Sequence, residues 1–166
     1  YDQVEQSTRF RNVGSRLLRS SDEILNVKES QSAYTDSTFF NLFDISLLAG
    51  DKNTALTKPN TLVLTKTAAE KHFGENEALG KTLIIDNEDT YTITGVIDDL
   101  PSNSFLRNHT VFLSMAGLDD ALNSIWGSNN YATFIKLNPN VEPETFKAEL
   151  ENVVKTYVMT WAQNIF

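Results

Sequence analysis

The sequence contains no cysteine among its 166 residues. This absence excludes thiol catalysis, zinc–thiolate sites and disulfide bonds, and it leaves the chain compatible with an oxidising compartment. No apolar run approaches the roughly 18 to 20 residues that a membrane-crossing helix needs. The chain begins with Tyr1 rather than methionine and shows no signal peptide, which predicts a processed product or an excised part of a longer protein.

Histidine is almost absent as well. His72 and His109 are the only two, and neither lies in an HxH or HExxH pattern, so the sequence favours no metal site. The acidic pairs Glu88–Asp89 and Asp98–Asp99 do not have the spacing of a calcium-binding EF-hand loop, and we interpret them as a solvated acidic rim. We therefore expect no metal site or catalytic cleft that unites the histidines with these acids.

Other catalytic patterns are missing too. The serines lie in no GxSxG motif, which removes the usual mark of a hydrolase. The glycines at 14, 74, 80 and 95 are too scattered to cradle a phosphate. Asn108-His109-Thr110 matches the glycosylation sequon, a short pattern that arises often by chance. The residues alone indicate a mixed α/β domain without a catalytic constellation or a cofactor site.

The charge is unevenly distributed. The formal net charge is −8, and most of the acidic excess lies after residue 60. An acidic surface repels phosphate backbones and anionic lipid headgroups. Nucleic acid is therefore excluded as a candidate partner.

The stretch from Thr61 to Ser104 has the clearest local signals. Residues 62–64 are apolar and partly β-branched, which predicts a buried strand. Thr67 and Glu70 have the spacing of a capping box, which predicts the start of a helix over residues 67–73. Gly74 follows where a left-handed C-cap is needed.

A hairpin is predicted next, with strands over 82–86 and 90–97 around the polar turn 86–89. Strict alternation places Tyr91, Ile93 and Ile97 on one face of the second strand and Thr92, Thr94 and Val96 on the other. Gly95 interrupts this strand, which indicates a bulge or a close approach of another backbone.

The N-terminal part is less clear. Residues 2–19 fit an amphipathic helix loosely, and residues 24–34 fit a strand. Four arginines in the first segment have two interpretations, an anion-binding patch or, as we favour, a solvated helix face: Arg9, Arg11, Arg16 and Arg19. Residues 45–48 fit a short strand.

Three phenylalanines occur within five residues. Asp36 or Ser37 is placed to cap a short helix that carries Phe39, Phe40 and Phe43. Such a cluster must be buried, either as a local core plug, which we favour, or as a hydrophobic contact surface.

The C-terminal part predicts strands over 110–115 and 131–137 and helices over 117–125 and 143–160. Pro143 suits the first position of the last helix. Five apolar residues recur there at helical spacing: Phe146, Leu150, Val153, Val154 and Tyr157. We expect this row to hold the helix against the strand at 131–137.

A string of ordered markers links these segments to a known family. The markers are Asp36-Ser-Thr-Phe-Phe-Asn-Leu-Phe-Asp44, Leu48-Ala-Gly-Asp51, Leu62-Val-Leu-Thr65, Phe73-Gly74, Leu79-Gly-Lys-Thr-Leu83, Gly95-Val96 and Asp99-Leu-Pro-Ser-Asn-Ser104. This string resembles the MacB-type periplasmic core domain of ABC transporter permeases of the MacB/FtsX-like family. The resemblance is dense over residues 34–104, continues more loosely to the last helix, and is weakest over 3–33.

The resemblance implies a non-catalytic domain on the periplasmic side of the bacterial inner membrane, between the first two membrane helices of a permease. It implies a cytoplasmic ABC ATPase, a second permease copy and, in some relatives, a periplasmic adaptor with an outer-membrane channel. The implied role is to couple ATP hydrolysis to export or extraction of a peptide, a macrolide-like drug or a lipoprotein, or to regulate wall hydrolases. None of the matching motifs is a substrate-contact motif, so no catalytic, cofactor-binding or metal residue is assigned.

The implied fold has two small α/β subdomains, a porter-like one formed by residues 1–35 with 105–166 and an inserted one at 36–104. We expect the isolated domain to be monomeric and its two ends to lie on one face. The alternative function is a stand-alone ligand-binding or adhesion module of the cell envelope. Membrane helices on both sides of the chain would decide for the transporter domain.

Overall fold

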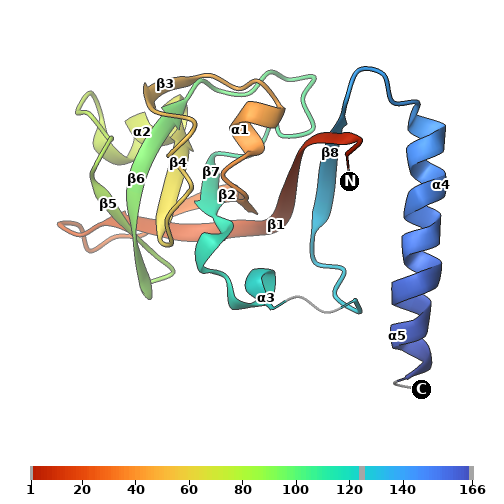
Figure 1. Cartoon of the computed structure of the whole chain (residues 1–166). Helices are drawn as coiled ribbons and strands as arrows, with labels where there is room; N and C mark the ends of the chain where they lie inside the picture. Colours follow the sequence, from red (N-terminus) through yellow and green to blue (C-terminus); the bar gives the residue numbers. More distant parts are fainter. Residues whose placement is uncertain (1, 124–125, 165–166) are drawn as a thin grey trace.

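The computed structural model describes residues 2–123 and 126–164 and has the mixed α/β fold that the sequence predicts (Figure 1). The strands are β1 (Val4–Ser20), β2 (Val27–Thr35), β3 (Leu47–Gly50), β4 (Thr61–Thr65), β5 (Thr82–Ile85), β6 (Asp89–Ile97), β7 (Val111–Ser114) and β8 (Ala132–Leu137). The α-helices are α1 (Phe39–Leu42), α2 (Lys66–Phe73), α3 (Asp119–Leu122), α4 (Pro143–Val153) and α5 (Met159–Gln163). A 3₁₀ turn covers Met115–Gly117, and a π-helical segment at Val154–Val158 joins α4 to α5.

Six of the strands close into a barrel. Their order is β2-β7-β4-β6-β5-β1, and β1 also pairs with β2, which completes the ring. β3 pairs with β6 outside this ring, and β8 pairs with the first part of β1. Each of the two expected subdomains supplies three of the ring strands, and the division itself stays a prediction.

β1 is the longest element, and the prediction of a helix over residues 2–19 is wrong. Thr8 and Phe10 are buried while their neighbours are half-buried or exposed, which is the two-residue period of a strand. Gly14 has φ +68° and lies where the β1–β2 register shifts, so it bends the strand at a position that favours glycine. The alternation of the strand could not be recognised in the sequence, because apolar residues before and after the bend face different sides: Phe10 packs in one core cluster and Leu18 in the other.

The β5–β6 hairpin confirms the predicted pair of strands. Asp86 and Asn87 both have positive φ, and the Glu88 amide donates to the Ile85 carbonyl over 3.0 Å. The chain thus turns through residues 86–88, between the paired Ile85 and Asp89, and two of these residues have the positive φ that hairpin turns commonly use.

Gly95 marks a bulge, as one interpretation of the sequence predicted. The register of β4 against β6 shifts there, and a Cβ on Gly95 would lie 2.6 Å from Leu47 Cδ2. The shift corrects the expected faces of β6. Val96 joins Ile93 in one core cluster, while Ile97 packs in the other, because an extra residue exchanges the two sides of a strand.

Helix α2 forms where predicted, but its cap differs. The N-cap is Thr65, whose hydroxyl accepts from the Ala68 amide, so the proposed capping box of Thr67 and Glu70 is wrong. Thr67 instead donates its amide and its hydroxyl to Asp99, over 3.1 and 2.5 Å. Gly74 ends the helix, but with φ +62° and ψ −133° it has a positive-φ conformation that favours glycine and not the expected left-handed C-cap.

The phenylalanine plug is confirmed. Phe39 and Phe40 are fully buried, and the Phe39 ring lies 5.9 Å from Phe10 and 5.7 Å from Phe112. The cap is again different, because Thr38 is the N-cap and makes no side-chain hydrogen bond there. Asp36 pairs with β1 instead.

Several predicted bounds shift. β2 begins at Val27 because Ile24 and Leu25 are almost fully exposed at the tip of the β1–β2 hairpin. β3 covers 47–50 rather than 45–48, and β7 and β8 agree with the predicted strands within a residue. The helix predicted over 117–125 is reduced to α3, and residues 124–125 lie outside the described part.

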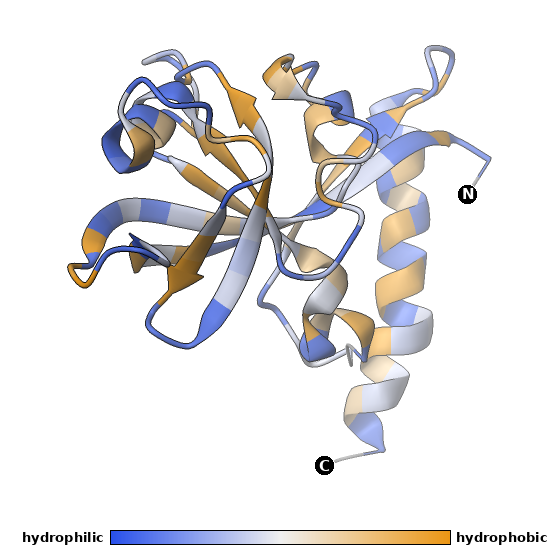
Figure 2. Ribbon diagram, turned by 90° about the vertical axis from the view of Figure 1, so that its left-hand side faces the viewer, coloured by the Kyte–Doolittle hydropathy of each residue, from blue (hydrophilic) through white to orange (hydrophobic). Residues whose placement is uncertain are grey.

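The position of the last helix agrees with the prediction, but the predicted packing of its apolar row is wrong. Phe146 is buried, whereas Leu150, Val154 and Tyr157 are 39 to 54% exposed. The apolar row therefore does not hold the helix against β8, and α4 and α5 stand beside the barrel as a separate rod (Figures 1 and 2). No helix in the described ranges is long and apolar enough to cross a membrane.

A buried polar network joins α2 to the barrel. Glu29 on β2 is 3% exposed, and its carboxylate lies 3.1 Å from His72 Nε2, 3.0 Å from Lys71 Nζ and 2.7 Å from Thr110 Oγ1. Burial alone would raise the pKa of Glu29, but the hydrogen bonds from His72, Thr110 and Lys71 outweigh it and lower the pKa to about 2.

This network predicts a pH-dependent loss of stability. Because the folded pKa is lower than the ordinary value of 4.5, the stabilisation is present above that value and lost as the pH falls towards 2. Glu29→Gln should lower the free energy of unfolding by about 3 kcal/mol at pH 7, with a difference that vanishes near pH 2. Urea denaturation at several pH values measures this, with exposed Glu88→Gln as the control. An equal loss at pH 2 and pH 7 would contradict the assignment.

Candidate functional site

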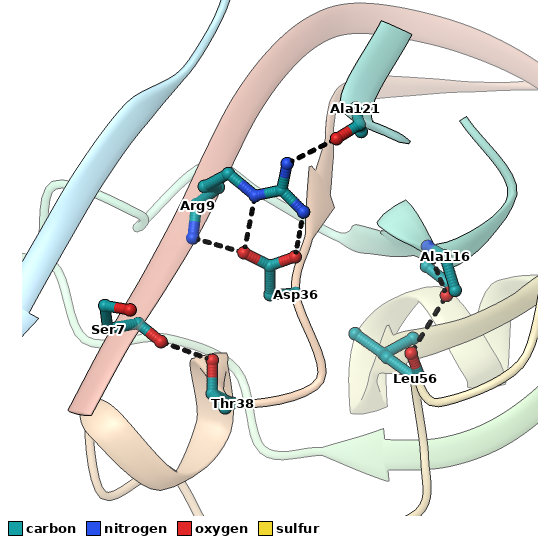
Figure 3. Close-up of polar contacts among 8 residues, drawn as sticks. Ser7, Arg9, Asp36, Thr38, Leu56, Ala116 and Ala121 are labelled. Atoms are coloured by element: carbon teal, nitrogen blue, oxygen red, sulfur yellow. Dashed lines mark hydrogen bonds and ion pairs between the residues drawn. The ribbon is translucent and has the colours of Figure 1, made fainter. Parts of the chain in front are cut away.

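The most specific polar cluster lies where β1 leaves the barrel (Figure 3). We call Arg9, Asp36 and Ala121 the Arg9 node. Arg9 Nε and Nη2 donate to the two carboxylate oxygens of Asp36 over 3.0 and 2.9 Å, and the Arg9 amide donates to the same carboxylate over 2.7 Å. Arg9 Nη1 donates to the Ala121 carbonyl over 2.7 Å. The node joins β1, the end of β2 and α3.

The strand register places these residues together. Phe10 pairs with Thr35, so Asp36 continues β2 directly opposite Arg9, and a planar guanidinium matches a carboxylate in this bidentate geometry. The hydrogen bond with Asp36 raises the pKa of Arg9 against the opposing effect of burial. Two residues further, Thr38 donates to the Ser7 carbonyl over 2.7 Å and fixes the start of α1 on β1 (Figure 3).

A second arginine of β1, Arg11, forms an ion pair with α3. Arg11 Nη1 lies 2.7 Å from the Asp120 carboxylate. The Tyr131 ring lies close to both guanidinium groups, 5.7 Å from Arg9 and 5.8 Å from Arg11, which is within the range of a cation–π contact. Burial and the neighbouring Asp120 raise the pKa of the Tyr131 phenol.

The rod of α4 and α5 is attached to this region at separate points. Gln3 Nε2 donates to Glu149 over 2.7 Å, just before β1 begins. The Trp126 and Tyr157 rings are stacked 5.7 Å apart. Gly127 contacts Trp161 so closely that a Cβ there would lie 2.3 Å from the indole. Together with the Arg9 node, these contacts form what we call the barrel–rod junction. Its groups hold parts in place, and they include no nucleophile paired with a base.

The two histidines occupy different environments. His72 contacts Glu29 in the network described above. His109 lies against the rings of Phe10 and Phe112, at 5.4 and 6.2 Å, and burial lowers the pKa of its imidazole. Across residues 2–123 and 126–164, no group of three or more acidic and histidine side chains could hold a metal ion.

The acidic residues singled out in the sequence have distinct roles. Asp99 accepts two hydrogen bonds from Thr67 and so caps α2 from outside the helix. Burial alone would raise the pKa of Asp99, but these hydrogen bonds lower it. Asp98, Glu88 and Asp89 are exposed, which agrees with a solvated rim. Asn108 of the sequon is exposed as well.

The arginines do not gather into an anion-binding patch, nor do they line a helix. Three of them pair with carboxylates from other elements: Arg9 with Asp36, Arg11 with Asp120 and Arg16 with Asp86. Arg19 donates to Asn87 and to the Glu23 carbonyl. The aspartates were missed as partners because nothing in their spacing points to β1. An interpretation of residues 4–20 as a strand would have revealed that Arg9 and Arg11 share one face.

Comparisons with known proteins agree with this architecture. The family described as MacB-like periplasmic core domain matches residues 2–153. Among solved structures, a domain of a permease protein from Porphyromonas gingivalis is 27% identical, with a TM-score of 0.79 over 93% of this chain and 71% of that one. No curated protein matches the chain.

Two further structures are 17% identical and share the fold. The periplasmic region of MacB from Actinobacillus actinomycetemcomitans has a TM-score of 0.68, over 99% of this chain and 77% of that one. The extracellular domain of the noncanonic ABC-type transporter YknZ from Gram-positive bacteria has a TM-score of 0.58, over 89% of this chain and 71% of that one.

The Arg9 node should stabilise the fold more than an ordinary surface ion pair. Asp36→Asn should lower the free energy of unfolding by about 2 kcal/mol, because one carboxylate accepts three hydrogen bonds, two of them charge-assisted. Glu5→Gln, which breaks the exposed Lys136–Glu5 pair, should cost less than about 1 kcal/mol. Thermal or urea denaturation of both variants measures this, and equal losses would contradict the importance of the node.

Proposed function

The chain belongs to the family of MacB-like periplasmic core domains, and from that premise we propose that it couples ATP hydrolysis on the cytoplasmic side of the membrane to movement of a substrate on the outer side. The family places it outside the membrane, as the periplasmic or extracellular domain of an ABC transporter permease. In this proposal the domain passes on motion rather than performing chemistry.

One observation carries the proposal: β1 is a single strand that runs from the barrel–rod junction through the barrel. It pairs with β8, β2 and β5 in turn. A displacement of the rod reaches the start of β1 through Gln3 and Glu149 and is then shared by every strand of the ring. Closed and densely bonded sheets resist local deformation, so the barrel would tilt as one body.

The partners proposed for this role are a cytoplasmic ABC ATPase and a second permease copy, with a periplasmic adaptor and an outer-membrane channel as further partners in an export assembly. The substrate would be a peptide, a macrolide-like drug or a lipoprotein. Within the domain, residues 1–35 with 105–166 would form the porter-like part, and 36–104 the inserted part. The residues of the junction support a mechanical role and not a catalytic one.

The proposal is tested by the response of the domain to nucleotide. The chain has no cysteine, so a spin label on Leu25→Cys, in an otherwise cysteine-free permease with its ATPase, reports the distance between two copies. This distance should change when the ATPase has hydrolysed ATP and is trapped with ADP and vanadate. Phe146→Ala, which removes the buried anchor of the rod, should abolish the change at retained ATP hydrolysis.

Leu150→Ala is the matched control, because its side chain is 39% exposed, and it should leave the distance change intact. A label distance that ignores nucleotide in the unmodified permease, while ATP is hydrolysed, would contradict the coupling role. Equal effects of both variants would contradict the anchor at Phe146.

A further inference from the structure

A groove of about 590 Å³ lies between β3, α2 and residues 74–79, on the opposite side of the barrel from the rod. Its floor is apolar and includes Ala49, Ala69 and Val96. The Leu48 side chain stands at its margin and is 58% exposed. The exposed Leu48 side chain and the apolar floor together form a small apolar surface that the barrel core does not use.

The backbone of β3 is open on the same side. On this side of β6, the Gly80 amide donates to the Ile93 carbonyl and the Ile93 amide donates to the Lys81 carbonyl. Further along the same side, β3 pairs with residues 95–97 of β6. β5 is covered in turn by β1. In the described ranges, by contrast, β3 pairs with β6 alone. Its outer edge therefore presents unpaired amide and carbonyl groups to the groove.

The rim of the groove carries unpaired negative charge. Glu70, Glu75 and Glu77 line it and are exposed, and their carboxylates have no hydrogen bond or ion pair with any other part of the chain that the structure describes. Lys66 is the one basic residue in the lining. Elsewhere, acids such as Asp36, Asp86 and Asp120 are neutralised by arginines. The negative charge of the rim therefore complements a cationic partner.

We propose that this groove binds an extended, basic segment of a partner protein, which adds to β3 as a further strand. Backbone hydrogen bonds to β3 would provide the pairing, apolar side chains would cover Leu48 and Ala49, and lysine or arginine side chains would meet the three glutamates. An anionic membrane is excluded as the occupant by the sign of the rim. The inference rests on the groove alone and does not depend on the coupling role.

The test uses the 166-residue chain and a fluorescent, capped nine-residue peptide of alternating valine and lysine. Fluorescence anisotropy at low salt should show binding. The triple variant Glu70→Gln/Glu75→Gln/Glu77→Gln should weaken it about tenfold, since each exposed ion pair contributes a few-fold. The matched control Glu88→Gln/Glu142→Gln/Glu151→Gln removes the same charge from exposed acids away from the groove and should change the affinity less than twofold.

The strand pairing is tested separately. The same peptide with N-methylated amides keeps its charge but cannot donate to β3, and it should lose at least tenfold in affinity. Leu48→Asp should weaken the unmodified peptide to a similar degree. Equal losses in both triple variants, equal binding of the N-methylated peptide, or no binding of the unmodified peptide would each overturn the proposal. A dimer of the chain that Leu48→Asp dissociates would assign the edge to a second copy and would also overturn it.

Discussion

The closure of the barrel depends on the hydrogen-bonded ladder of β1. This strand has 17 residues, and two of its three partners lie far away in the sequence: Val4 pairs with Leu137 and Leu18 with Ile85. The third partner, β2, follows β1 in a hairpin and pairs Lys28 with Leu17. The same residue, Leu18, is bonded on both sides and fully buried. Without this strand β2 and β5 would both be open edges, and the two core clusters would lose the wall between them and solvent.

The sequence predicted well where the deciding contacts are local. Within residues 61–104, the strand, the helix and the hairpin follow from periodicity, turn residues and a terminal glycine, all of which act over a few positions. β1 was misjudged because a bend at Gly14 breaks its alternation and its partners cannot be recognised from spacing. The ion pairs could not be predicted for the same reason, because residues such as Arg11 and Asp120 are brought together only by the fold.

Caps and faces show how small shifts matter. Thr67 has suitable spacing to cap α2, yet its hydroxyl donates to Asp99, which follows β6. The N-cap of α2 is Thr65 instead. One added residue at Gly95 exchanges the faces of β6 on which Val96 and Ile97 lie. The barrel–rod junction could not be predicted at all, because helical spacing shows which face of α4 is apolar but not whether another surface covers it.

The exposed face of the rod is informative about what it can transmit. A helix clamped along its whole length would move only with the barrel, whereas this rod is held by Phe146 and Glu149 near its start and by Tyr157 and Trp161 near its end. The π-helical segment Val154–Val158 follows Glu149 and precedes Trp161, and it contains Tyr157; such segments interrupt the regular hydrogen bonding of an α-helix. Rotation at one end can therefore be absorbed there or passed on to β1 through Gln3. The balance between the two depends on how firmly the start of the rod is held, which is why we expect the buried Phe146, and not the exposed Leu150, to govern the proposed coupling.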